Sequence, residues 1–224
     1  MSLTLSAQES AATNLFYLER APKVKTENPP LLILLHGIGS NEADLFSFAD
    51  QLPDNFLVVS VRAPYTLGQG SYAWYQMEFN GGTPSINKEQ EIKSRALLFQ
   101  FIEELSHKLK FDATKIYLCG FSQGAIMSYS LALTQPSRIH AIAVMSGRIL
   151  DEIKPQIAAK EKVKSLKIFI SHGTQDPTLN IAYARSAQTY LQELGIHPSY
   201  KEYPERHTIS AQMLADLIAW LKQN

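Results

Sequence analysis

The middle of the chain reads Ile116-Tyr117-Leu118-Cys119-Gly120-Phe121-Ser122-Gln123-Gly124-Ala125-Ile126-Met127. It begins with a short apolar run, typical of a strand buried on both faces, and ends with the start of a helical pattern. Between them lies G-x-S-x-G, whose glycines allow a turn so tight that the serine hydroxyl projects above the sheet edge. We therefore predict a strand–turn–helix unit with Ser122 at its turn. A plain small-residue turn, as in any α/β protein, is the alternative.

Short apolar runs of the same kind alternate along the chain with segments whose apolar residues are spaced by three or four. The runs lie at residues 31–35, 56–61, 141–145 and 166–170, with flanking or edge strands at 14–20 and 199–203. The helical segments lie at residues 42–51, 88–110, 123–134, 180–194 and 210–222. This order predicts an α/β protein, with a mostly parallel central sheet covered by helices on both faces, as a single domain over residues 1–224. Ligands of such sheets bind beyond the carboxyl ends of the strands.

The composition excludes several classes of protein. Among the 224 residues, 21 Lys+Arg balance 21 Asp+Glu, so the charge gives no reason to expect a nucleic acid or an anionic membrane surface as a partner. A single cysteine cannot form an internal disulfide, and no apolar run approaches the roughly 20 residues that span a bilayer. Residues 1–9 lack the basic and apolar regions of a signal peptide. We expect a soluble, cytoplasmic protein.

A serine hydroxyl is a weak nucleophile unless a base and an orienting carboxylate act on it. These partners are expected later in the chain, in the order acid and then histidine, each after a strand. Asp176 follows the run at 166–170, and His207 follows the last strand. Two competitors stay open: Glu205 is an alternative acid, and His172 is an alternative base that precedes Asp176 in the chain. Cys119, inside the strand before the turn, is expected in the core.

The loop after the strand at 31–35 reads His36-Gly37-Ile38-Gly39-Ser40-Asn41. Its glycines let the backbone approach a ligand and present free N–H groups. We predict that the N–H groups of Ile38 and Gln123 hold a developing oxyanion. A dinucleotide fingerprint is excluded, because it requires a third glycine where this chain has Glu42. No Walker lysine motif, H-E-x-x-H or paired C-x-x-C is present, so we expect no metal and no nucleotide cofactor.

Together these residues resemble the α/β-hydrolase superfamily and, within it, the phospholipase/carboxylesterase family of acyl-protein thioesterases and small bacterial carboxylesterases. The resemblance runs from Leu31 to Trp220. It rests on three motifs, His36-Gly37-Ile38-Gly39, Gly120-Phe121-Ser122-Gln123-Gly124 and His172-Gly173-Thr174-Gln175-Asp176-Pro177, and on the position of His207.

The resemblance implies roles for these residues: Ser122 is the nucleophile, Asp176 the acid and His207 the base, with Ile38 and Gln123 as oxyanion donors. The implied substrate is a small-molecule ester or thioester, and the family permits a monomer or a homodimer. Two departures stand out. Arg206 replaces the family's usual glycine before the histidine, where it would crowd the site or contact a substrate carboxylate. Residues 178–180 replace the small apolar residues and proline that often follow the acid.

Substrate specificity is expected from the long segment 63–87, which we interpret as a functional loop because connections of this length rarely lack regular structure. Trp74, Tyr75 and Met77 are its candidate pocket residues, with Trp74 first among them, although such aromatic residues also serve simply to cover a core. Gly37 and Arg148 complete the predicted substrate-binding set. The chain has no insertion long enough for a large lid domain, so we expect an open site and small to medium acyl groups.

Two other functions remain open at this point. A non-catalytic binding module with the same fold is one, although such modules usually lack a member of the triad. The other is a different acyl-transfer or C–C bond-cleaving activity on the same triad, because a fold does not determine its chemistry.

Overall fold

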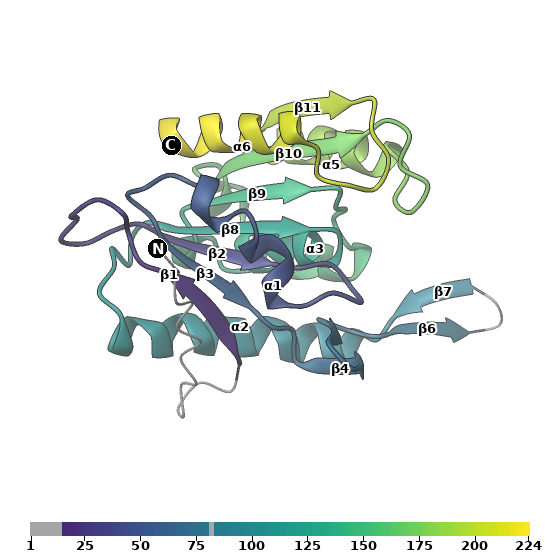
Figure 1. Cartoon of the computed structure of the whole chain (residues 1–224). Helices are drawn as coiled ribbons and strands as arrows, with labels where there is room; N and C mark the ends of the chain where they lie inside the picture. The colour runs from purple at the N-terminus through teal and green to yellow at the C-terminus, as the bar shows by residue number, and fades with distance from the viewer. Residues whose placement is uncertain (1–14, 81–82) are drawn as a thin grey trace.

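The computed structural model describes residues 15–80 and 83–224. Within this part of the chain, seven strands form one sheet in the order β1-β3-β2-β8-β9-β10-β11 (Figure 1). The strands are β1 Tyr17–Arg20, β2 Leu31–Leu35, β3 Leu57–Val61, β8 Ile116–Phe121, β9 Ala141–Met145, β10 Lys167–Gly173 and β11 Ser199–Tyr203. Only the edge strand β1 is antiparallel to its neighbour. The predicted mostly parallel sheet is confirmed.

Helices cover both faces of this sheet, because successive residues of each buried strand point to opposite sides. In β2, Leu31, Ile33 and Leu35 join one core, and Leu32 and Leu34 join the other. Helices α2, α3 and α5 pack in the first core, and α1 and α6 in the second (Figure 1). The α-helices are α1 Glu42–Phe46, α2 Lys88–Lys108, α3 Gln123–Thr134, α4 Lys160–Val163, α5 Ala182–Glu193 and α6 Ala211–Gln223, and the 3-10 turns are η1 Ala49–Gln51, η2 Pro136–Arg138 and η3 Asp151–Gln156.

The segment 63–87 is more regular than the sequence indicates. It contains two antiparallel pairs, β4 Tyr65–Gly68 with β5 Ser71–Ala73, and β6 Met77–Asn80 with β7 Thr83–Ile86. Gly70 has a φ of +68°, a conformation that glycine adopts without steric cost, and so closes the first pair. The second pair extends away from the body of the molecule, at the edge of the sheet where the parallel strands end (Figure 1).

The predicted single domain spans residues 1–224, and the predicted first strand begins at Asn14. Residues 1–14 lie outside the described residues, so these parts of the two predictions stay predictions. None of the described helices is both long enough and apolar enough to cross a membrane.

The turn between β8 and α3 brings three pieces of backbone into contact. A Cβ atom added at Gly120 would lie 2.3 Å from the backbone of Gly124, and one added at Gly124 would lie 1.9 Å from the carbonyl oxygen of Leu35. Real Cβ atoms do not approach backbone atoms this closely. The two glycines therefore let α3 begin directly against the end of β2, as the sequence predicts.

Replacing Gly124 with alanine should lower the free energy of unfolding by about 3 kcal/mol or more, because the rigid backbone of β2 leaves no room for a methyl group. The matched control is Gly68→Ala, since a Cβ atom at Gly68 meets nothing within 4 Å. The control should change stability by no more than about 0.5 kcal/mol. Urea unfolding followed by tryptophan fluorescence measures both variants. Equal stability of the two variants would show that this close approach does not constrain the fold.

Candidate active site

Ser122 lies at the turn between β8 and α3 in a strained backbone conformation. Its φ of 52° and ψ of −116° lie outside the regions that L-residues usually adopt. The strain is held by the backbone on both sides: the Ser122 N–H donates to the carbonyl oxygen of Met145 at 3.0 Å, and the Ile126 N–H donates to the Ser122 carbonyl oxygen at 3.1 Å. The serine side chain is thereby directed out of the sheet at the carboxyl edge.

Ser122, His207 and Asp176 form one hydrogen-bonded row. Nε2 of His207 lies 2.9 Å from Oγ of Ser122, and Nδ1 of the same ring lies 2.6 Å from Oδ2 of Asp176. The three side chains come from the loops after β8, β10 and β11, whose carboxyl ends share one edge of the sheet. The ring of Phe121 packs against the imidazole with ring centroids 4.9 Å apart. The structure thus brings together the three residues that the sequence predicts as a set.

The Asp176 carboxylate is buried and fully partnered. Its Oδ1 accepts the backbone N–H groups of Thr178 at 2.8 Å and Leu179 at 2.9 Å, while Oδ2 faces His207. Burial disfavours the charged form, but the hydrogen bonds from His207, Leu179 and Thr178 outweigh burial and hold the pKa of Asp176 below its usual range. Asp176 is therefore ionised at neutral pH. The unusual residues at 178–180 do not weaken the hydrogen bonding of Asp176, because Thr178 and Leu179 contact it through their backbone N–H groups.

A second histidine, His172, lies next to the same carboxylate. It is completely buried at the end of β10, and its Nε2 lies 2.7 Å from the carbonyl oxygen of Leu179 and 3.4 Å from Oδ2 of Asp176. Because a carbonyl oxygen only accepts, Nε2 carries the ring proton in this contact. Burial lowers the pKa of His172 despite the contacts to Leu179 and Asp176, so the ring is neutral. The alternative role of His172 as base conflicts with this position, because its ring contacts Asp176 and Leu179 while His207 contacts Ser122.

The competing acid Glu205 is not bonded to the histidine. Its backbone carbonyl accepts the Gln175 N–H at 2.9 Å, whereas the carboxylate partner of His207 is Asp176. The Arg206 side chain is exposed and is not part of the cavity wall described below, so it neither crowds Ser122 nor reaches the cavity. Cys119 is buried in the core, where burial raises the pKa of its thiol to about 12.

The loop after β2 is fastened by His36, a residue whose part in the site the sequence pattern does not reveal. Its Nε2 accepts the backbone N–H of Ala63 at 3.0 Å, so the proton sits on Nδ1, which donates to the Gly37 carbonyl oxygen at 2.8 Å. Burial lowers the pKa of His36 and keeps the ring neutral. A Cβ atom at Gly37 would lie 3.3 Å from Cβ of Ser122, so the loop passes directly beside the serine.

Two backbone N–H groups next to Ser122 are free to bind a ligand. Those of Ile38 and Gln123 make no hydrogen bond with any residue that the structure describes. The Gln123 N–H is one of the unsatisfied donors at the start of α3, where the helix dipole favours a negative charge. Ile38 lies in the turn held by His36, and its side chain is 41% exposed.

Trp74 corrects one expectation from the sequence. Instead of lining a pocket, its side chain is completely buried, and its Nε1 donates to the His36 carbonyl oxygen at 2.9 Å. The Gln123 side chain completes this clamp, because its Oε1 accepts the Trp74 N–H and its Nε2 donates to the Tyr75 carbonyl oxygen, both at 2.7 Å. Ser94 of α2 also donates to the Trp74 carbonyl oxygen. Trp74 is thus a buried support that joins segment 63–87 to the loop after β2 and to α3.

A cavity of about 610 Å³ opens beside Ser122, a size typical of small-molecule sites. Tyr75, Met77 and Arg148 lie on its wall, as do both residues with free N–H groups. Residues of β7, of the loop after Asp176 and of the first turn of α5 also line the cavity. The full lining is Ile38, Tyr75, Met77, Ser85, Ile86, Ser122, Gln123, Ile126, Arg148, Asp151, Glu152, Thr178, Leu179 and Tyr183.

Comparison with known proteins identifies the family of this chain. The model of the phospholipase/carboxylesterase family matches residues 21–224. Acyl-protein thioesterase 1 of Candida albicans is 28% identical over 91% of this chain and 95% of its own length. Esterase YpfH of Escherichia coli is 30% identical over 74% of this chain and 69% of its own length.

Among solved structures, a carboxylesterase of Bacillus cereus superposes with a TM-score of 0.79, covering 93% of this chain and 94% of that one, at 22% sequence identity. At that identity, the superposition shows the fold alone. It is the α/β-hydrolase fold that the sequence predicts. The chain belongs to the phospholipase/carboxylesterase family and is a carboxylic ester hydrolase.

Proposed function

We propose that this protein hydrolyses carboxylic esters and thioesters of small to medium acyl groups through a covalent intermediate on Ser122. The observation that carries the proposal is the His207 ring, which lies 2.9 Å from the serine oxygen and 2.6 Å from the Asp176 carboxylate. In the first step, Oγ of Ser122 attacks the carbonyl carbon while Nε2 of His207 accepts the hydroxyl proton. Asp176 remains ionised, holds the imidazole in the required tautomer and stabilises the imidazolium.

The oxygen of the attacked carbonyl becomes negatively charged in this step. The free N–H groups of Ile38 and Gln123 are the proposed donors to it, and neither has to leave another partner first. The loss of one such donor typically costs about 2.7–4 kcal/mol of transition-state stabilisation. The hydrogen bonds of His36 and Gln123 to the surrounding backbone keep the two donors in place before the substrate arrives.

The remaining steps complete the acylation of Ser122 and then hydrolyse the acyl-enzyme with the same groups. The leaving alcohol or thiol takes the proton from His207, and the acyl group remains on Ser122. Water then loses a proton to His207 as it attacks the acyl carbon, and the serine leaves with that proton. The wall residues Ile38, Tyr75 and Met77 supply apolar surface for the substrate. A cytoplasmic location, and a monomeric or homodimeric state, stay predictions.

His172 is the proposed positioning residue for the acid. By donating from Nε2 to Leu179, it secures the turn whose N–H groups hold Asp176. A neutral imidazole is suited to this position, because a charged ring there would draw the carboxylate away from His207. The charged or titratable groups that act on His172 are Asp176, His207 and, on β11, Glu202.

Ser122→Ala should abolish ester turnover and labelling by a fluorophosphonate, because the variant lacks the nucleophile while its fold is unchanged. The matched control is Ser106→Ala, which removes an exposed serine hydroxyl on α2. Hydrolysis of a 4-nitrophenyl ester, with the melting temperature as a check of folding, measures the effect. Substantial turnover by folded Ser122→Ala would refute the proposed mechanism.

The stability of the protein should decrease as the pH falls below about 6.5, the ordinary histidine pKa. The pKa of His172 is lowered in the folded state, so the unfolded chain binds the proton first. The stabilisation is complete above the unfolded pKa and is lost as the pH falls toward the folded one. His36, also buried with a lowered pKa, adds to the effect.

Urea unfolding between pH 7.5 and pH 5.5 measures this loss, which should be smaller in His172→Gln than in the unsubstituted protein. The control His107→Gln replaces an exposed histidine of α2 and should retain the original pH dependence, because it leaves His172 and His36 in place. An identical pH dependence in His172→Gln and His107→Gln would mean that His172 does not contribute to it.

A further inference from the structure

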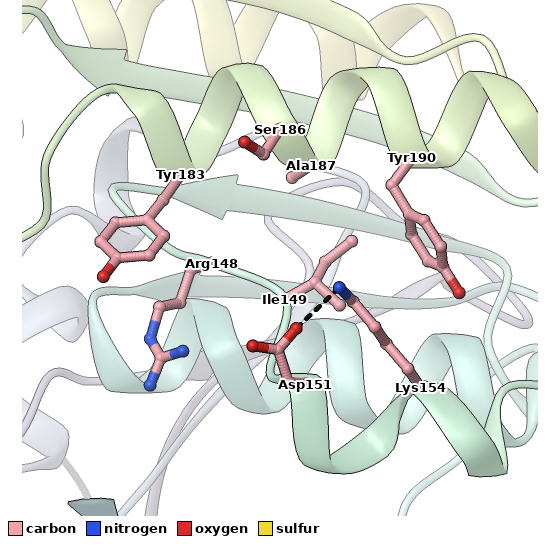
Figure 2. A pocket seen from close by; sticks show the side chains of 8 residues that line it. All are labelled: Arg148, Ile149, Asp151, Lys154, Tyr183, Ser186, Ala187 and Tyr190. Carbon is pink, nitrogen blue, oxygen red and sulfur yellow. Dashed lines mark ion pairs between the residues drawn. The ribbon is translucent and has the colours of Figure 1, made fainter.

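Arg148 stands between two adjacent cavities. It lies in the loop that follows β9, is half-buried, and belongs to the wall of the cavity beside Ser122. A second cavity of about 240 Å³ lies between this loop, η3 and α5 (Figure 2). Arg148, Asp151 and Tyr183 line both cavities, so these three side chains form the boundary between them. A group bound to Arg148 is therefore within the space open to a substrate of Ser122.

At this boundary one cation, Arg148, has neither a hydrogen bond nor a close ion pair among the described residues. Asp151 is paired with Lys154 at 2.6 Å, as the dashed line in Figure 2 marks. The guanidinium group of Arg148 makes no hydrogen bond and no ion pair within 4.0 Å with any of the described residues. Its charge still acts on Asp151, whose pKa is lowered first by the hydrogen bond from Lys154 and to a smaller extent by Arg148. The guanidinium carbon lies 5.5 Å from the ring centroid of Tyr183. Figure 2 shows the guanidinium group below the Tyr183 ring, with the Asp151 carboxylate between it and Lys154.

Arg148 differs in this respect from most of the other arginines in the chain. Five of them donate to a carboxylate, amide or carbonyl oxygen, and a sixth, Arg206, is exposed to solvent. The five donors are Arg20, Arg62, Arg95, Arg138 and Arg185. A guanidinium group is always charged, and it is costly to hold one partly buried without an oxygen acceptor. An incoming anion would supply the missing acceptor.

We propose that Arg148 binds a carboxylate carried by the substrate, so that the enzyme prefers esters with one negative charge over neutral esters of the same length. This inference rests on the proposed function and adds the substrate class. The planar guanidinium group matches a carboxylate with two parallel hydrogen bonds, and the aromatic face of Tyr183 orients it. Glu152, the remaining carboxylate on the wall, acts in the opposite direction and lowers the affinity for anions.

The test compares two matched pairs of substrates. In the first pair, mono-4-nitrophenyl adipate carries a carboxylate on the acyl group, and 4-nitrophenyl hexanoate is the neutral ester of the same acyl length. The pair 4-carboxyphenyl butyrate and phenyl butyrate places it on the alcohol side. For each pair, the readout is the ratio of kcat/KM for the anionic ester to kcat/KM for the neutral one, and Arg148→Gln is compared with the unsubstituted protein.

Arg148→Gln should lower this ratio at least about tenfold for one of the two pairs, the amount expected from losing a charge-assisted hydrogen bond. The change should arise mainly in KM, and added salt should weaken the preference of the unsubstituted protein, because ions screen a partly exposed pair. Arg148→Lys, which keeps the charge but loses the planar fork, should give an intermediate ratio. A ratio that changes less than about twofold for both pairs would overturn the proposal.

Two controls separate an anion site from general effects of charge or structure. Arg206→Gln removes an exposed positive charge beside His207 and should change the ratio far less than Arg148→Gln. Glu152→Gln removes the opposing negative charge and should raise the ratio. If Glu152→Gln lowered the ratio as much as Arg148→Gln does, the effect would come from distortion of the wall, and the proposal would fail.

Failure of the proposed esterase function can be distinguished from failure of this site. If the unsubstituted protein cleaves none of the four esters, the esterase proposal fails, and calorimetric titration with adipate then tests Arg148 by itself. Arg148→Gln should weaken adipate binding at least about tenfold. Equal binding by the two proteins, or no binding by either, would overturn the anion site.

Discussion

The site depends on one steric constraint, the contact between the start of α3 and the end of β2. It requires glycine at position 124, where a Cβ atom would lie 1.9 Å from the Leu35 carbonyl oxygen. Ser122, two residues before this contact, has a positive φ, and the N–H of Gln123 at the start of α3 has no partner among the described residues. The proposed nucleophile and one of the proposed oxyanion donors thus lie in the turn that this close packing permits.

Buried polar groups keep this arrangement rigid. His36 holds the loop after β2, while the Gln123 side chain and Trp74 connect that loop to α3 and to the segment between β3 and α2. On the other side, His172 and the N–H groups after Asp176 hold the carboxylate. Each of these hydrogen bonds lies within the protein, so the groups that we propose to meet the substrate are in position without having to reorganise.

Much of this could be predicted from the sequence, because the strongest signals are local. Buried strands and amphipathic helices have their own periodicities, and the order of Ser122, Asp176 and His207, each after a predicted strand, follows from the chain alone. The pairs β4–β5 and β6–β7 could not be predicted, since they are short and lack alternation. The prediction that Trp74 lines the pocket is wrong, because composition does not show which way an aromatic ring points. The unpaired state of Arg148 likewise emerges only from tertiary contacts.

The central claim is that Ser122 becomes acylated during turnover. Rapid quenching during hydrolysis of a 4-nitrophenyl ester, followed by mass spectrometry of the digested protein, tests it directly. The expected result is a burst of nitrophenol together with an acyl group on Ser122, in the peptide that carries the turn after β8. An acyl group on another residue, or turnover in which the quenched protein carries no acyl group and shows no burst, would contradict the claim.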